Sequence, residues 1–156
     1  MSDESGCLAC DLIDGRQELP GGRIDETRHW VVEHCVGPLS VGALIVKPLR
    51  HVVHVADLTA EESAELGPLL QRTSAALTEL TAPEQIYVTL WSHAGGVPGH
   101  IHFVVQPVHK PEMERHGRYG PALQVAMFAT GEHPGPDEVR AFADRMRAHL
   151  QVGHGA

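Results

Sequence analysis

A pair of histidines inside an apolar run is the feature of this sequence best suited to chemistry. The run is Gly99–Pro107, and His100 and His102 lie within it, two residues apart. Residues i and i+2 of a strand point to the same face, so the two rings are expected side by side, with Ile101 and Phe103 packed behind them. The alternative is a strand that carries two surface histidines in a chain with many histidines.

His102 is the candidate nucleophile. A neutral imidazole can attack phosphorus and form a covalent histidine intermediate, which splits one difficult step into two. The ring must be held in one tautomer by an acceptor on its other nitrogen, and a strand offers a fixed backbone carbonyl for this. The glycine-rich stretch 94–99 could supply N–H donors to a phosphate, which makes Gly95 and Gly96 candidate ligand-binding residues.

A Cys-x-x-Cys pair, Cys7 and Cys10, is the candidate metal site. Three interpretations are open: a redox pair, two ordinary cysteines, or half of a tetrahedral zinc site. The redox pair is disfavoured because a polar segment precedes Cys7 where a strand would be needed. For zinc, two histidines must complete the site, and His51 and His100 lie at the ends of expected strands. The competing histidines are His54, His93 and His109.

Length and composition fit one ordinary domain. The chain has 156 residues, of which 42% are hydrophobic, and a formal charge of −8 from 20 acidic and 12 basic side chains. A lysine- or arginine-rich patch is absent, which argues against nucleic acid or an anionic membrane as partner but allows a small phosphorylated ligand. The acidic start and the lack of an apolar run of about 20 residues favour a cytoplasmic protein. We expect a single domain over residues 1–156, with 1–6 and 152–156 disordered.

Hydrophobic patterns predict an α+β fold. Thr59 and Glu62 form a capping box in front of a long helix, which contains Gly67-Pro68. Short connections between the strands imply an antiparallel sheet of about five strands, packed with this helix and a C-terminal helix. Residues 108–134 give no confident assignment. The expected strands and the terminal helix are Arg23–Thr27, Trp30–Glu33, Ala43–Val46, Gln85–Trp91, the histidine strand and Asp137–Leu150.

Together these segments resemble the histidine-triad (HIT) family of nucleotide hydrolases and transferases, over roughly residues 7 to 107. Three motifs carry the resemblance in the family's order. Cys7–Gly15 is similar to the zinc-type opening, Gly42–Pro48 with His51 to the middle strand, and His100–Pro107 to the triad strand. The resemblance implies a zinc-bearing HIT-like domain whose sheet continues across a homodimer.

The resemblance also implies a role for individual residues. In zinc-bearing members a structural Zn²⁺ is held by residues that correspond here to Cys7, Cys10, His51 and His100. The nucleophile corresponds to His102, and the expected partner is a small phosphorylated or nucleotide-like ligand.

Four features of the ligand site depart from the family pattern. The third triad histidine is replaced by Val104, which cannot hydrogen-bond, and the polar pair before the triad corresponds to Gly96 and Val97. The ribose-binding aspartate corresponds to Cys35, and the asparagine expected near Thr89 to Ser92 is absent. The positions expected to bind the ligand are Gly95, Gly96, Val97, Cys35 and His93.

Three functional hypotheses follow. The leading one is a hydrolase or nucleotidyltransferase that acts on a nucleotide or phosphoester through a covalent phosphohistidine on His102. The second is a HIT-like domain that binds a ligand or partner and has lost catalysis. The third is altered chemistry in the same pocket, with His93, Cys35 or Glu33 recruited.

Overall fold

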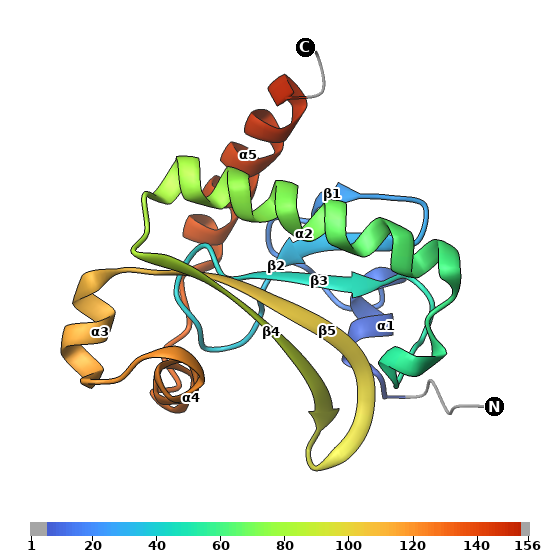
Figure 1. The fold of residues 1–156 in the computed structure, drawn as a ribbon, viewed down its shortest axis with the longest axis horizontal. Coiled ribbons are helices and arrows are strands. Elements are labelled where there is room, and N and C mark those ends of the chain that lie inside the picture. Colours follow the sequence, from blue (N-terminus) through green and yellow to red (C-terminus); the bar gives the residue numbers. More distant parts are fainter. Residues whose placement is uncertain (1–5, 154–156) are drawn as a thin grey trace.

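Five antiparallel strands form one sheet in the order β1-β2-β3-β5-β4. The computed structural model describes residues 6–153 and confirms the α+β class (Figure 1). All four strand pairings are antiparallel, as the short connections predict. The strands are β1 Arg23–Glu26, β2 Trp30–His34, β3 Leu44–Pro48, β4 Gln85–Ala94 and β5 Val97–Val108.

Helices cover both faces of the sheet. The long helix and the C-terminal helix pack on one face, around a core that includes Trp30, Leu77 and Phe142. A helix from the unassigned region packs on the other face, where Leu123 and Met127 contact Val104. The helices are α1 Leu8–Ile13, α2 Ala60–Thr81, α3 Lys110–His116, α4 Gly120–Ala129 and α5 Pro136–Gly153, with a 3-10 turn, η1, at Val55–Asp57.

The predicted capping box fixes the start of α2. The Thr59 side chain accepts a hydrogen bond from the Glu62 N–H, and the Glu62 carboxylate accepts one from the Thr59 N–H. The helix continues through Pro68, so the proline does not move its start.

The connection between β4 and β5 is tighter than the sequence suggested. Both strands extend beyond their expected ends at Trp91 and Gly99, so only Gly95 and Gly96 lie between them. Their φ angles are +59° and +83°, which glycine adopts without a steric penalty in a two-residue hairpin turn. The expected phosphate-binding loop is therefore a hairpin tip, because the strands pair up to Ala94 and Val97.

The chain ends differ in part from expectation. Helix α5 extends to Gly153, so residues 152 and 153 are helical, whereas disorder was expected there. Residue 6 is described and lies in a turn; the rest of the expected disorder, residues 1–5 and 154–156, lies outside the described residues. Within residues 6–153, no helix combines the length and the apolar character needed to span a bilayer.

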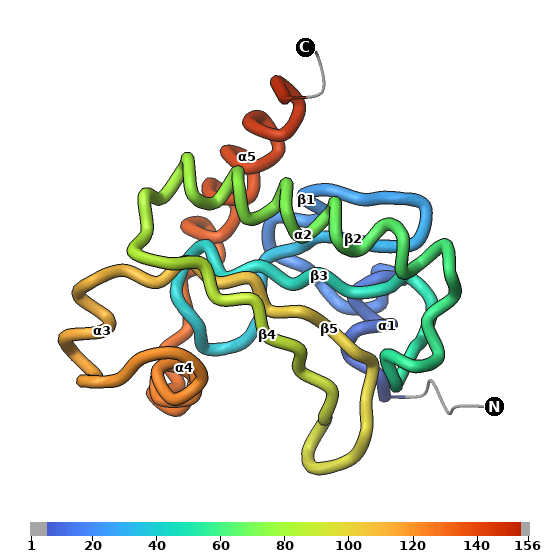
Figure 2. The backbone as a smooth tube through the Cα atoms, in the orientation of Figure 1, coloured from blue at the N-terminus to red at the C-terminus, as the bar shows by residue number. Residues whose placement is uncertain are grey.

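Strand alternation divides β5 into two functional faces. Phe103 and Val105 point to the core under α2 and α5, as predicted for the residues behind the histidines. His100, His102 and Val104 point to the other face, where a cavity lies. Figure 2 shows how the chain path brings α1 next to β5, although about ninety residues separate them.

Candidate functional site

Four side chains from three segments bring potential metal ligands together. Cys7 and Cys10 belong to the start of α1, His51 follows β3, and His100 lies on β5; their ligand atoms all lie within 4.8 Å of one another. The Cys10 Sγ is 3.3 Å from Nδ1 of His51 and 3.5 Å from Nδ1 of His100. Ligand atoms on a tetrahedral zinc ion lie roughly 3.5 Å apart, given bonds of about 2.0–2.3 Å. The donor set and its spacing therefore fit zinc.

The surroundings of His100 also suit a metal ligand. Its Nε2–H donates a hydrogen bond of 2.8 Å to the Pro48 carbonyl, which leaves the Nδ1 lone pair directed at the cysteines. A partner of this kind on the other ring nitrogen is typical of metal-bound histidine. Burial lowers the pKa of His100 to about 4, so the ring is neutral at physiological pH, as metal coordination requires.

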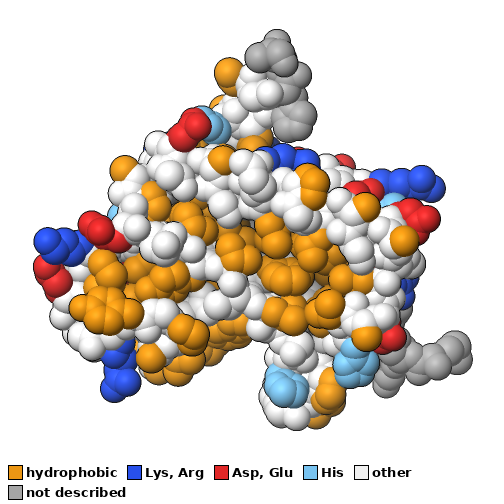
Figure 3. Space-filling view, in the orientation of Figure 1, with side chains coloured by type: hydrophobic (Ala, Val, Ile, Leu, Met, Phe, Trp, Pro, Cys, Tyr) orange, Lys and Arg blue, Asp and Glu red, His pale blue; other side chains and the backbone are white. Residues whose placement is uncertain are grey.

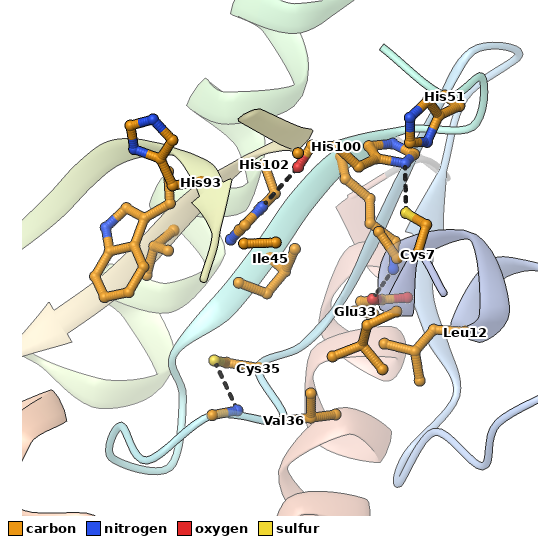
Figure 4. A pocket seen from close by; sticks show the side chains of 18 of the residues that line it. Cys7, Leu12, Glu33, Cys35, Val36, Ile45, His51, His93, His100 and His102 are labelled. Carbon is orange, nitrogen blue, oxygen red and sulfur yellow. Dashed lines mark hydrogen bonds and ion pairs between the residues drawn. The ribbon is translucent and has the colours of Figure 1, made fainter. Parts of the chain in front are cut away.

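The three competing histidines lie outside this cluster. The Nε2–H of His109 donates to the Thr81 carbonyl at 2.9 Å, next to α3. His54 is exposed in front of η1. His93 lies on β4, and Figure 4 shows its ring directed away from His102.

His102 has one ring nitrogen fixed and the other available. Its Nδ1–H donates a hydrogen bond of 3.1 Å to the carbonyl of His100, two residues earlier on the same strand. This bond selects the tautomer in which Nε2 carries the lone pair. Burial lowers the pKa of His102, although the bond to His100 opposes the shift. The ring lines the cavity beside the metal cluster (Figure 4).

The cavity has a volume of about 710 Å³ and an ion pair in its wall. Lys47 on β3 donates to the Glu33 carboxylate on β2, and both side chains are almost fully buried. Burial raises the pKa of Glu33, and the Lys47 charge opposes this shift. The Lys47 ammonium therefore engages Oε1 of Glu33 and offsets part of the cost of burying its charge.

Three of the five expected ligand-binding residues line the cavity. Cys35, Val97 and His93 do so, whereas Gly95 and Gly96 do not, because they form the hairpin tip. The Cys35 Sγ accepts a hydrogen bond of 3.3 Å from the Gly37 N–H. Burial raises the pKa of the Cys35 thiol to about 11, which keeps it neutral.

The strand register settles which neighbour of Cys35 faces the cavity. Glu33 shares that face, whereas His34 points to the opposite one. The Nε2 of His34 accepts a bond from the Gly42 N–H, and its Nδ1–H donates to the Cys35 carbonyl. His34 is therefore a structural residue of the core under α5.

Val104 occupies the place of the expected third histidine. It lines the cavity next to His102 but is also buried against Leu123 and Met127 of α4. An apolar side chain at this position joins the cavity wall to the core beneath α4.

Several cavity residues were not identified from the sequence. Lys47 lies two residues after Ile45 on β3, and both line the cavity, so strand alternation places them on one face. Trp91 pairs with His102 across β4 and β5, and only the register reveals this. Phe128 comes from α4, in the region that gave no assignment, and no sequence signal pointed to it.

A search of curated proteins found one relative with significant similarity over nearly the whole chain. It is the adenosine 5'-monophosphoramidase hnt1 of Schizosaccharomyces pombe, 24% identical over 148 residues, which cover 93% of this chain and 98% of the relative. No family model matches the chain.

Solved structures share the fold over almost the full length. A Zn-bound histidine triad family protein from Mycobacterium smegmatis superimposes with a TM-score of 0.67 and 20% identity, over 99% of this chain and all of that one. A HIT-like protein involved in cell-cycle regulation from Bartonella henselae gives 0.69 and 17%, over 95% and 98%. These likenesses bear out the five-stranded antiparallel architecture.

Proposed function

We propose, from the premise that the chain belongs to the histidine-triad (HIT) family, that it is a hydrolase or transferase acting on phosphorus. The substrate is a small phosphorylated, nucleotide-like ligand, and His102 is the nucleophile. The observation that supports this most directly is the free Nε2 of His102 in a cavity of about 710 Å³, with Nδ1 engaged by the His100 carbonyl. The similarity to a nucleotide phosphoramidase points in the same direction.

The reaction divides into two balanced steps. The Nε2 lone pair of His102 forms a bond to phosphorus while the bond from phosphorus to the leaving group breaks. The leaving group departs with that electron pair and takes a proton from solvent. Water or another acceptor then attacks phosphorus and gives up a proton, and the electron pair of the P–N bond returns to Nε2. Through both steps the Nδ1–H stays on the carbonyl of His100, which holds the ring in place.

A structural zinc ion is part of the proposal. Cys7, Cys10, His51 and His100 would hold it, with both cysteines as thiolates. The ion would tie α1 and the segment after β3 to β5, the strand that carries His102. It supplies rigidity, and the chemistry stays with His102.

The test is trapping of the intermediate. The protein is incubated briefly with adenosine 5'-phosphoramidate or a dinucleoside polyphosphate, quenched, and analysed by intact mass. We expect a phosphorus-bearing adduct and turnover in the parent protein, and neither in His102→Ala. The matched control is His54→Ala, an exposed histidine outside the cavity, which should behave like the parent. Absence of adduct and turnover across a broad phosphate panel would exclude the proposal.

A binding function without catalysis is the second candidate, and Val104 favours it. A valine cannot donate a proton or a hydrogen bond to the ligand beside His102. If this candidate holds, phosphorylated ligands bind to the cavity without turnover, and His102→Ala changes only their affinity.

A homodimer is the proposed assembly. β4 is an edge strand of the sheet, and Val88 and Leu90 on it are 44% and 41% exposed. Figure 3 shows apolar side chains gathered between α2 and the β4–β5 hairpin. A second copy of the chain, related by a two-fold axis, would cover this apolar surface and could pair with the edge of β4.

A further inference from the structure

Exposed apolar side chains gather at the mouth of the cavity. Leu8, Val36, Val97 and Phe128 are between 37% and 63% exposed, and all four line the cavity. They come from α1, the loop after β2, the start of β5 and α4. Single exposed apolar residues are ordinary, whereas a ring of them around one opening marks a surface for an apolar group.

The apolar character continues inward from the mouth. The rings of Trp91 and Phe128 lie 5.1 Å apart at an angle of 58°. The indole N–H of Trp91 donates to the Gln124 side chain, so its polar atom is already used. Leu39 and Val104 extend the same wall toward His102.

Several polar side chains of the cavity already have other partners. Glu33 is bound by Lys47, and Cys35 accepts from the Gly37 N–H. His51 and His100 face the metal cluster. Among the described cavity residues, Glu33 carries the only carboxylate, its Oε1 accepts from Lys47, and no carboxamide side chain lines the cavity. A ribose packed on Trp91, Phe128 and Val97 would bury hydroxyl groups without a side-chain partner, which costs affinity.

We infer that the substrate carries an apolar ester group, aromatic or aliphatic, on the phosphorus that His102 attacks, where a nucleotide substrate would carry a ribonucleoside. This narrows the substrate class and rests on the proposed function. In the balanced steps given above, the apolar group stays on phosphorus in the covalent intermediate, packed on Trp91 and the apolar mouth. The other substituent departs with its electron pair and a proton from solvent.

Two substrates with the same leaving group test the inference. One is the 4-nitrophenyl diester of 2-naphthylmethyl phosphate, and the other is the 4-nitrophenyl diester of adenosine 5'-monophosphate. Both release 4-nitrophenolate, so release rates compare only the retained groups. We expect kcat/KM to be at least about tenfold higher for the naphthylmethyl diester, since that group buries more apolar surface without unpaired hydroxyls. Equal rates, or a preference for the adenosine diester, would overturn the inference and leave the proposed function standing.

If turnover is absent, ligand binding to the His102→Ala variant distinguishes the proposed function from the apolar-ligand assignment. Calorimetry would compare 2-naphthylmethyl phosphate with adenosine 5'-monophosphate. If the parent shows no turnover but the naphthylmethyl ligand binds at least about tenfold more tightly, the proposed function fails and the apolar-ligand assignment holds. If neither ligand binds, both fail.

A matched pair of surface variants locates the effect. Val97 and Val125 are 63% and 62% exposed, and only Val97 lines the cavity. Val97→Asn should lower kcat/KM for the naphthylmethyl diester by about threefold to tenfold, and by a larger factor than kcat/KM for the adenosine diester. Val125→Asn should change neither. An equal loss from both variants, or no loss from Val97→Asn, would contradict an apolar subsite at the mouth.

Discussion

His100 and His102 differ in which ring nitrogen their backbone partners leave available. The Pro48 carbonyl takes the Nε2–H of His100, so Nδ1 faces the cysteines. The His100 carbonyl takes the Nδ1–H of His102, so Nε2 faces the cavity. Two identical residues on one strand face therefore present different ring nitrogens, which suits the two roles proposed for them, metal coordination and nucleophilic attack.

Zinc binding gives the prediction at the scale of single residues. The protein as purified should contain about one zinc ion per chain by elemental analysis, and Cys10→Ser should lose it and melt at a lower temperature. The reason is that the ion would join three segments, the start of α1, the segment after β3 and β5. The control is Cys35→Ser, which changes a cysteine outside the cluster and should retain the metal. A parent protein that is metal-free as purified, or one that stays equally stable after chelation, would contradict the prediction.

At the scale of neighbouring strands, the Glu33–Lys47 pair joins β2 to β3 under the cavity. Lys47→Met leaves an uncompensated carboxylate at a site where Glu33 is 2% exposed. We expect the free energy of unfolding, measured in urea, to fall by about 3–5 kcal/mol. The double variant Lys47→Met/Glu33→Leu should recover most of that loss, because it removes both charges. A double variant as unstable as the single one would show that the loss came from packing.

Helix α2 gives a pH prediction through Glu62. Hydrogen bonds from the Arg50 guanidinium, together with the Thr59 N–H, hold the pKa of Glu62 at about 2. A lowered pKa in the folded state stabilises the protein above the ordinary glutamate pKa, and this stability is lost as the pH falls from about 4.5 toward 2.

Glu62→Gln should therefore lower the free energy of unfolding by about 1–3 kcal/mol at pH 7, and the difference from the parent should shrink toward pH 2. The measurement is a series of urea unfolding curves across this pH range. The control is Glu61→Gln, an exposed neighbour in the same helical turn, with an expected change under about 0.5 kcal/mol. A difference between Glu62→Gln and the parent that does not depend on pH would rule out the ionic explanation.

The sequence was informative where short-range patterns decide the structure. Alternation placed His100 and His102 on one face, and the Thr59–Glu62 box fixed the start of α2. It was less informative where distant segments meet. A longer loop was expected around residues 95–96. The turn is short because strand pairing extends past the apolar residues on which the expectation rested. Phe128 could not be placed in the cavity, since the packing of α4 on the sheet depends on tertiary contacts that no local pattern encodes.

At the scale of the whole molecule, the helices leave one edge of the sheet uncovered. α2 and α5 pack mainly over β1, β2 and β5, and Val88 and Leu90 of β4 stay exposed. Val88 pairs with Val105, and Leu90 pairs with Phe103, which places the exposed residues on the same face as the core under α2. The apolar surface of the sheet thus extends beyond the area that α2 covers, as expected for a surface that a second subunit buries.

Sedimentation should therefore give about twice the chain mass of 16.9 kDa at micromolar concentration. Leu90→Asp places a charge on the proposed interface and should yield the monomer, because a carboxylate buried there without a partner opposes association. Val55→Asp is the control: Val55 is 47% exposed, lies on η1 away from β4, and its change should leave the dimer intact. A monomeric parent would exclude the dimer, and a Leu90→Asp variant that still sediments as a dimer would move the interface to another surface. If Leu90→Asp yields a folded monomer, its turnover will show whether the cavity acts without the partner subunit.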